Sequence, residues 1–510
     1  MKKHGRLLTA FGFLLAGVFV LAAPAFAQSV DDKIKSLEQE LLLLKDQQIE
    51  LKKEATAAAQ AMPSFSYRPG NGLNIEAADK SWGVRFTIET HFRYEFESGR
   101  DQIGRTNGEL MGRRFRPGVL YCINNCLWEI EATLDLDGWG TGNGKNSLNT
   151  STSSILQRGA VNFHAENLNP WLPTVQFGME VQNAGGGSLA RQGSGTVGAQ
   201  AEYDLLTRGN GFNTGRAGSG IVLNWDDRSL TDIGIPGRIG KFQIGMSSIG
   251  EGDDGLQSFT DRKDFNTYLS IQPFSEVKNK WISGLTFEYG AWFCNVDLRA
   301  IQNGCGSFQI QDHGDGARQN MISSGNFGDG LVVAHGPGVV WSVGPYTLRA
   351  MGSFEGGEDR GGTKGNKRSA GWLIGHDLYL WSPKGFLTGS ATTPNSILVG
   401  THFERAAVRI GCNGSTGIPC SATGIGGSIT QFHRNRILLR EWDLWYVIAP
   451  RMNVGINVLW YDAANLRTGA NQAAHNLGIC DTPHVTPATG CRNGIGGDWV
   501  DVMLNWRYTF

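Results

Sequence analysis

The stretch WVDVMLNWRYTF, residues 499–510, alternates apolar and polar side chains up to a final aromatic residue. Neighbouring side chains of an extended strand point to opposite faces, so this stretch predicts a strand with one apolar and one polar face. The apolar face carries Val500, Val502, Leu504, Trp506, Tyr508 and Phe510. The polar face carries Asp501, Asn505, Arg507 and Thr509. Such a strand fits a soluble sandwich or a membrane barrel, and the rest of the chain must decide between them.

Residues 1–27 carry the pattern of a secretory signal peptide. Lys2, Lys3 and Arg6 precede the apolar run LLTAFGFLLAGVFVLAA, and Ala25-Phe26-Ala27 forms a small-x-small cleavage site. The alternative is an uncleaved anchor, for which the apolar run is short. We expect an exported chain that begins at Gln28.

The composition narrows the remaining choices. No apolar stretch after Ala27 approaches the roughly 20 residues of a membrane-spanning helix, so the mature chain is expected to be soluble or a β-barrel. Loss of the signal peptide removes three positive charges and no acid, which takes the formal net charge from −1 to −4. This balance argues against nucleic acid as a partner.

The eight cysteines fall into four close pairs. The pairs are Cys122 with Cys126, Cys294 with Cys305, Cys412 with Cys420, and Cys480 with Cys491. An even number in an exported chain favours disulfides that each close a short loop. Metal binding is the competing interpretation, but no pair has CxxC spacing and there is no CxxCH haem motif. We expect no cofactor and no metal site.

Residues 28–62 are predicted to form a short periplasmic helix with a heptad seam. The seam positions, at spacings of three and four, are Ile34, Leu37, Leu41, Leu44, Gln48, Leu51, Ala55 and Ala58. The other positions are largely charged, so a lone helix would leave the seam in water, and self-association as a coiled coil would bury it. The alternative is a helix that packs on its own domain.

From residue 63 to 510 the pattern changes to strands with a period of two. In WGVRFTIETHFRYEFES, residues 82–98, one face is apolar and the other is charged. The apolar face carries Val84, Phe86, Ile88, Phe92, Tyr94 and Phe96. This alternation is longer than that of most sandwich strands, whereas a tilted membrane strand needs about 9 to 11 residues in lipid. The charged face is too polar for a dry core but fits a water-filled lumen.

Further strand pairs follow along the chain, separated alternately by short turns and by long Gly-, Asn- and Asp-rich segments. Residues 113–138 form a hairpin with Cys122 and Cys126 beside its turn, and the segments 138–154 and 304–330 are long loops. Short turns at one end and long loops at the other are typical of a membrane barrel. The length predicts an all-β, antiparallel transmembrane β-barrel of about 16 strands. The partner of its outer face is then outer-membrane lipid.

Several short motifs, in order, carry a resemblance to a known family. They are Arg113-Arg114-Phe115-Arg116, GMEVQ at 178–182, AEYDLL at 201–206 leading to Gly215-Arg216, Pro273-Phe274, Gly344-Pro345, and Phe386-Leu387-Thr388-Gly389. The chain resembles the phosphate-selective porin O and P family of Gram-negative outer membranes, from which it departs at Ser390, where the family has an acid. The resemblance implies a homotrimer of channels that draw small anions, often phosphate, inward. The terminal Phe510 also resembles the insertion signal of outer-membrane barrels.

Arginines on the polar strand faces are the candidate pore-lining residues: Arg85, Arg93, Arg114 and Arg116. The planar guanidinium makes two hydrogen bonds to one oxyanion, and fixed charge in a narrow pore concentrates the opposite ion. Five acids are predicted on the same lumen-facing side of the strands as these arginines: Glu89, Glu95, Glu129, Glu131 and Asp135. The alternative is therefore that the arginines pair with these acids and only stabilise the wall.

Nothing in the sequence predicts an enzyme. There is no GxSxG, no HExxH and no paired-carboxylate motif, and the histidines are scattered. We expect an outer-membrane porin for passive diffusion of small hydrophilic solutes. A structural or partner-bound barrel with little channel activity is the alternative, followed by a soluble secreted sandwich.

Overall fold

The computed structural model describes residues 30–68, 71–98, 107–134, 136, 156–179, 220–248, 263–296, 309–311, 320–323, 330–358, 366–382, 393–411, 432–466 and 495–510. The predicted signal peptide lies outside these residues. The chain divides into two units, Met1–Pro63 and Ser64–Phe510. The boundaries predicted from the sequence, 1–27, 28–62 and 63–510, stay a prediction.

The first unit contains the helix α2, Val30–Ala61, which confirms helical structure in this segment. Its leucines are exposed, among them Leu37, Leu41, Leu44 and Leu51 at 62 to 65%. Self-association through this seam stays a prediction. None of the described helices is long and apolar enough to cross a membrane.

The second unit is a closed antiparallel β-barrel, which confirms the predicted fold class. Its described residues form a sheet of 18 strands, of which β1 and β2 are a hairpin and the other 16 form the ring. The first half of the ring is β3 Trp82–Ser98, β4 Asn107–Ile123, β5 Trp128–Leu134, β6 Leu156–His164, β7 Thr174–Met179, β8 Gly220–Ser229, β9 Arg238–Ser248, β10 Lys263–Gln272 and β11 Leu285–Val296. The second half is β14 Gly330–Val343, β15 Tyr346–Glu358, β16 Asn366–Trp381, β17 Ser396–Gly411, β18 Phe432–Ala449, β19 Met452–Leu466 and β20 Ile495–Thr509. Each strand pairs with its neighbours in this order.

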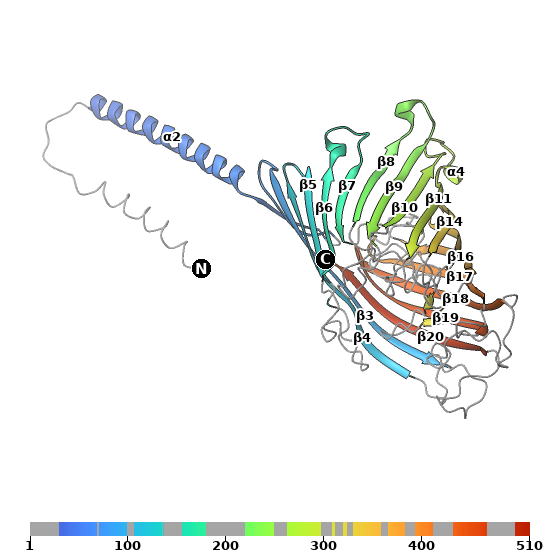
Figure 1. Cartoon of the computed structure of the whole chain (residues 1–510). Coiled ribbons are helices and arrows are strands. Elements are labelled where there is room, and N and C mark those ends of the chain that lie inside the picture. Colours follow the sequence, from blue (N-terminus) through green and yellow to red (C-terminus); the bar gives the residue numbers. More distant parts are fainter. Residues whose placement is uncertain are drawn as a thin grey trace. The chain divides into compact units, whose positions relative to one another are not determined.

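The ring closes between its last and first strands. β20 pairs with β3 from Val500 opposite Ser98 to Thr509 opposite Glu89, and Figure 1 shows the red β19 and β20 beside the light-blue β3 and β4. Closure leaves the ring of 16 strands without a free edge, because each of its strands pairs with a neighbour on both sides.

The hairpin of β1, Ser64–Arg68, and β2, Gly72–Glu76, extends this closure. β2 pairs with residues 83–86 of β3, on the same edge that β20 uses further along. Between the two, the backbones of Phe510 and Ile88 exchange two hydrogen bonds of 2.7 and 3.3 Å. The chain terminus is therefore held between β20 and β2 along one edge of β3.

The two faces of the ring differ as the alternation predicts. On β3, Phe92 is 53% exposed, whereas its neighbours His91 and Arg93 are 0% exposed. On β20, Leu504 and Trp506 are exposed, whereas Asn505 and Arg507 are buried. The outer face is therefore apolar, and the polar face of the same strands lines the inside.

Some segments differ from the sequence-based expectation. The short helix α4, Lys280–Ser283, precedes β11, and the Asn279 side chain caps it by accepting a 3.0 Å hydrogen bond from the backbone N–H of Trp281. Within 304–330, predicted as a loop, β12 Gln309–Gln311 pairs with β13 Asn320–Ser323. Two 3₁₀ turns, η1 Ala165–Asn167 and η2 Thr231–Ile233, connect β6 with β7 and β8 with β9.

The outer face generates a prediction at Leu504, whose partners in register, Ile456 and Tyr94, are also exposed. Leu504→Arg should lower the free energy of unfolding in phospholipid vesicles by about 2–4 kcal/mol, because it places a charge in hydrocarbon. Urea titration measures this, with Leu504→Ala as the control for lost side-chain volume. Equal losses in both variants would mean that Leu504 does not face lipid.

Candidate functional site

Buried charged side chains line the inner wall of the barrel. Eight acids are buried there: Glu95, Glu288, Glu355, Asp377, Glu404, Glu441, Asp443 and Asp501. Four arginines are buried with them: Arg93, Arg116, Arg349 and Arg507. Among the described residues, the buried wall therefore contains more acid than guanidinium.

A band of these side chains, which we call the wall network, begins on β15. The Arg349 guanidinium lies 2.5 Å from Asp377 Oδ2 on β16. The other carboxylate oxygen, Oδ1, lies 3.6 Å from Nε2 of His402 on β17. A Cβ at Gly375, the residue opposite His402, would lie 2.5 Å from the imidazole, so glycine leaves the space that the ring occupies.

The network continues from β17 onto β18 and β19. Nδ1 of His402 lies 2.9 Å from Asp443 Oδ2 and 3.8 Å from Glu441 Oε2. On the far side of the two carboxylates, the Asn457 amide donates to Asp443 Oδ1 and, over 3.4 Å, to Glu441 Oε1. One imidazole from β17 and two carboxylates from β18 therefore converge, with the Asn457 amide of β19 beside them.

From β19 the network crosses the closure of the barrel. Asn505 donates a 2.8 Å hydrogen bond to Asn457 Oδ1, and its own Oδ1 accepts a 2.9 Å bond from Arg93 Nε. The same oxygen lies 2.7 Å from His91 Nε2, and an Arg93 nitrogen lies 3.8 Å from Glu95. Residues 412 and 414 positions apart in sequence thus share one chain of polar contacts.

An aromatic contact lies beside this chain. The Arg507 guanidinium lies 4.0 Å from the ring centroid of Trp445, which packs with Tyr379 and Leu398. Trp445 pairs in register with Gly455, where a Cβ would lie 2.2 Å from the indole. Glycine at 455 lets the indole lie across β19, where it offers its face to the cation.

The predicted pore-lining arginines are only partly brought together. Arg93 belongs to the wall network, and Arg116 lies 4.0 Å from Glu89. Arg85 is half-buried on the inner face of β3. Arg114 pairs in register with His91, but its side chain lies outside the described residues. A role of these arginines in ion selection stays a prediction.

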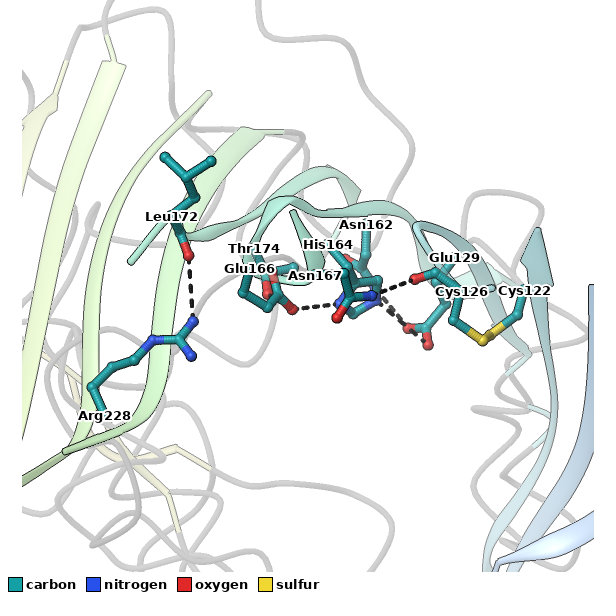
Figure 2. Close-up of polar contacts among 10 residues, drawn as sticks. All are labelled: Cys122, Cys126, Glu129, Asn162, His164, Glu166, Asn167, Leu172, Thr174 and Arg228. Carbon is teal, nitrogen blue, oxygen red and sulfur yellow. Dashed lines mark hydrogen bonds and ion pairs between the residues drawn. A yellow bond between two sulfur atoms is a disulfide. The ribbon is translucent and has the colours of Figure 1, made fainter. Parts of the chain in front are cut away.

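A second polar group, the rim cluster, lies where β5, β6 and β7 meet η1 (Figure 2). The imidazole of His164 lies 2.7 Å from Glu166 and 3.8 Å from Glu129, which accepts a 2.8 Å hydrogen bond from Asn162. Thr174 donates a further 2.7 Å bond to Glu166. Partial burial raises the pKa of Glu166, but the hydrogen bonds from Thr174 and His164 outweigh it and hold that pKa below its usual value.

The Cys122–Cys126 disulfide closes the β4–β5 turn beside this cluster, as predicted (Figure 2). Asn167 of η1 donates a 3.4 Å hydrogen bond to the Cys126 carbonyl oxygen and so joins the two turns. The other predicted pairs, Cys294–Cys305, Cys412–Cys420 and Cys480–Cys491, involve side chains outside the described residues. Their pairing stays a prediction.

The predicted insertion signal, Phe510, ends the chain at the barrel closure. Its ring centroid lies 5.1 Å from that of Tyr67 on β1. The Tyr67 hydroxyl also lies 3.0 Å from that of Tyr508. The aromatic end of the chain is therefore packed on the hairpin, and its role in insertion stays a prediction.

Most of the wall network was missed by reasoning from the sequence. His402 was one of several scattered histidines, and the strand that carries it was not identified. The alternation of side chains could have revealed the two acids, because Glu441 and Asp443 alternate with Trp442 and Leu444 just as lumen-facing residues alternate with lipid-facing ones. Their approach to His402 depends on cross-strand register.

The packing of Trp445 over Gly455 generates a prediction. Gly455→Ala should destabilise the barrel by about 1–3 kcal/mol, because the methyl group would force the indole or the backbone to move. The matched control is Gly356→Ala on β15, where a Cβ would meet nothing within 4 Å. Urea unfolding in vesicles compares the two, and equal stability of both variants would contradict the contact.

The chain is similar, at low sequence identity, to several solved structures of outer-membrane proteins. No model of a protein family and no curated protein matches the chain. Among solved structures, it is similar to an anion-selective porin from Comamonas acidovorans, with 10% identity over 84% of this chain and 100% of that one, at a TM-score of 0.45. It is also similar to OmpT, an outer membrane protein of Vibrio cholerae, with 9% identity over 84% and 98% of the two chains, at 0.45. The outer membrane channel DcaP of Acinetobacter baumannii shows 9% identity over 84% and 98%, at 0.40.

The architecture of the barrel indicates which membrane the protein spans. Sixteen antiparallel strands in a closed ring, apolar outside and ionisable inside, are how β-structure spans a Gram-negative outer membrane. The protein is an outer-membrane β-barrel.

Proposed function

We propose that the barrel is a porin, a water-filled channel through which small hydrophilic solutes diffuse passively across the outer membrane. The observation that carries the proposal is the closed 16-strand ring whose inner face holds ionisable side chains while its outer face is apolar. Barrels of this strand number are wide enough to leave an aqueous channel.

The charge of the wall supports a preference for cations. Fixed charge along a narrow, partly desolvated path raises the local concentration of the opposite ion. The eight buried acids outnumber the four buried arginines of the described wall, and Arg93, Arg116 and Arg349 each lie near a carboxylate. An arginine whose charge is balanced in this way attracts anions weakly.

Anion preference, often for phosphate, is what the family resemblance implies. Arg85, Arg93, Arg114 and Arg116 would then line the path. This stays a prediction, and the experiment that tests the cation preference also decides it.

The reversal potential of single channels in a potassium chloride gradient tests the proposal. The purified protein in a planar bilayer should give discrete current steps. Its reversal potential should have the sign expected for a channel that prefers potassium over chloride. Glu355→Gln combined with Asp501→Asn should shift the potential toward chloride, because two wall charges are removed. Leu504→Ala on the outer face is the control and should leave the potential unchanged.

Two outcomes would contradict this proposal. A wild-type potential of the opposite sign, enlarged by added phosphate, would establish an anion porin. A folded barrel that gives no current steps would favour the structural or partner-bound barrel instead. Folding is checked separately by the change in gel mobility on boiling.

We further propose that α2 assembles the chain as a homotrimer. The seam leucines of α2 are exposed in the single chain, and a coiled coil would bury them. Three barrels would be joined in this way through their N-terminal helices.

Charged substitutions on α2 test the assembly. Leu41→Lys with Leu44→Lys should convert trimers to monomers, because both positions lie on the seam. Leu42→Lys with Leu43→Lys, at 59 and 61% exposure but off the seam, is the matched control and should stay trimeric. Light scattering of the detergent complexes gives the mass. A monomeric wild type, or the same mass in both variants, would refute the role of the seam.

A further inference from the structure

We infer that His402, Glu441 and Asp443 form a binding site for a divalent transition-metal cation in the barrel wall. One ligand atom from each residue lies within 4.8 Å of the others, and all three side chains are buried. Imidazole and carboxylate are the ligands that zinc shares with iron and manganese.

The distances between ligand atoms fit a metal. Bonds of about 2.0–2.2 Å at a tetrahedral angle place two ligand atoms about 3.4 Å apart. Nδ1 of His402 lies 2.9 Å from Asp443 Oδ2 and 3.8 Å from Glu441 Oε2, on either side of this value. A cation between them therefore requires only small shifts of each side chain.

The imidazole itself points to a ligand. His402 is 1% exposed, and neither of its ring nitrogens makes a hydrogen bond with the described residues. Asp443 Oδ2, which faces Nδ1, also makes none. Buried polar atoms normally have such a partner, and a metal bound to Nδ1 and Oδ2 would supply one.

The surrounding residues orient the ligands as the second shell of a metal site does. The Asn457 amide donates to Oδ1 of Asp443 and to Oε1 of Glu441, so that Oδ2 and Oε2 are the oxygens directed at His402. On the other side of the ring, Nε2 faces the Asp377 carboxylate at 3.6 Å. A carboxylate there favours the tautomer with its proton on Nε2 and the lone pair on Nδ1.

The charge balance also supports a divalent cation. If ionised, Glu441 and Asp443 would present two negative charges to a cation bound beside the imidazole. A divalent ion cancels both charges. A protonated His402 would cancel one of them, and this is the competing arrangement that an experiment must separate.

Zinc is the probe for the test. The full-length protein is folded in detergent, stripped with a chelator and dialysed against Zn²⁺, and the metal per chain is measured. We expect one zinc per barrel, with affinity at least tenfold weaker in His402→Ala and in Asp443→Asn, since changes even outside the ligand set cost 10- to 100-fold. The matched control is Glu288→Gln, which removes a buried wall carboxylate on β11 and should bind zinc as the wild type does.

The same measurements can overturn the inference. Zinc binding that is unchanged in His402→Ala, or absent from the stripped wild type, would leave the protonated histidine as the explanation. If a variant fails to fold, as judged by its mobility before and after boiling, X-ray absorption of the zinc-loaded wild type decides. A shell of imidazole nitrogen and carboxylate oxygen is expected, and a shell with sulfur would assign the metal to cysteines instead.

Discussion

The pairing of β20 with β3 is the constraint on which the rest of the molecule depends. In a bilayer, no water is available to the N–H and C=O groups of a free strand edge, so a sheet is stable there only as a closed ring. Closure also separates the two faces of every strand into an inside and an outside. Once Leu504 and Trp506 face lipid, Asn505 and Arg507 must face inward, and the same logic places charged side chains on the inside of the other strands.

Burial of these charged side chains costs free energy, and pairing them across neighbouring strands of the inner wall offsets this cost. The wall network runs from Arg349 on β15 to Glu95 on β3 through carboxylates, an imidazole and two asparagines. Glycines at 375 and 455 provide the room, because any side chain there would collide with His402 or Trp445. Wall charges are thus held in place by groups on neighbouring strands.

Alternation of side chains was sufficient to predict the fold, and insufficient for the site. The faces of β3 and β20 follow from the alternation of side chains, the strand number follows from the length of the chain, and the Cys122–Cys126 disulfide follows from sequence proximity. β17 was not recognised, because Arg405 is exposed on the outer face and Ala406 is buried on the inner face, which reverses the expected polarity. The alternation of faces is also interrupted on β4. There Gly112 pairs with Phe92 and Arg114 pairs with His91, so Arg113 is an extra residue in the pairing with β3.

The site depends on information that a single strand does not contain. His402 lies opposite Glu441, and Asp443 lies opposite Asn457, only for one register of β17 on β18 and of β18 on β19. A slip of one residue would turn each of these side chains to the other face. The convergence of three ligand atoms is therefore a property of the assembled sheet.

The shared edge of β3 has a consequence for biogenesis. β2 directly precedes β3 in the sequence, so this local pairing can cover residues 83–86 early in folding, whereas β20, the partner of residues 89–98, begins only at Ile495. Most of this edge of β3 then stays open until the distant strand arrives, and long-range pairings of this kind form slowly. The pairing of β20 with β3 joins strands that are far apart in sequence, so a chaperone that shields unpaired strand edges would act at this edge of β3 above all.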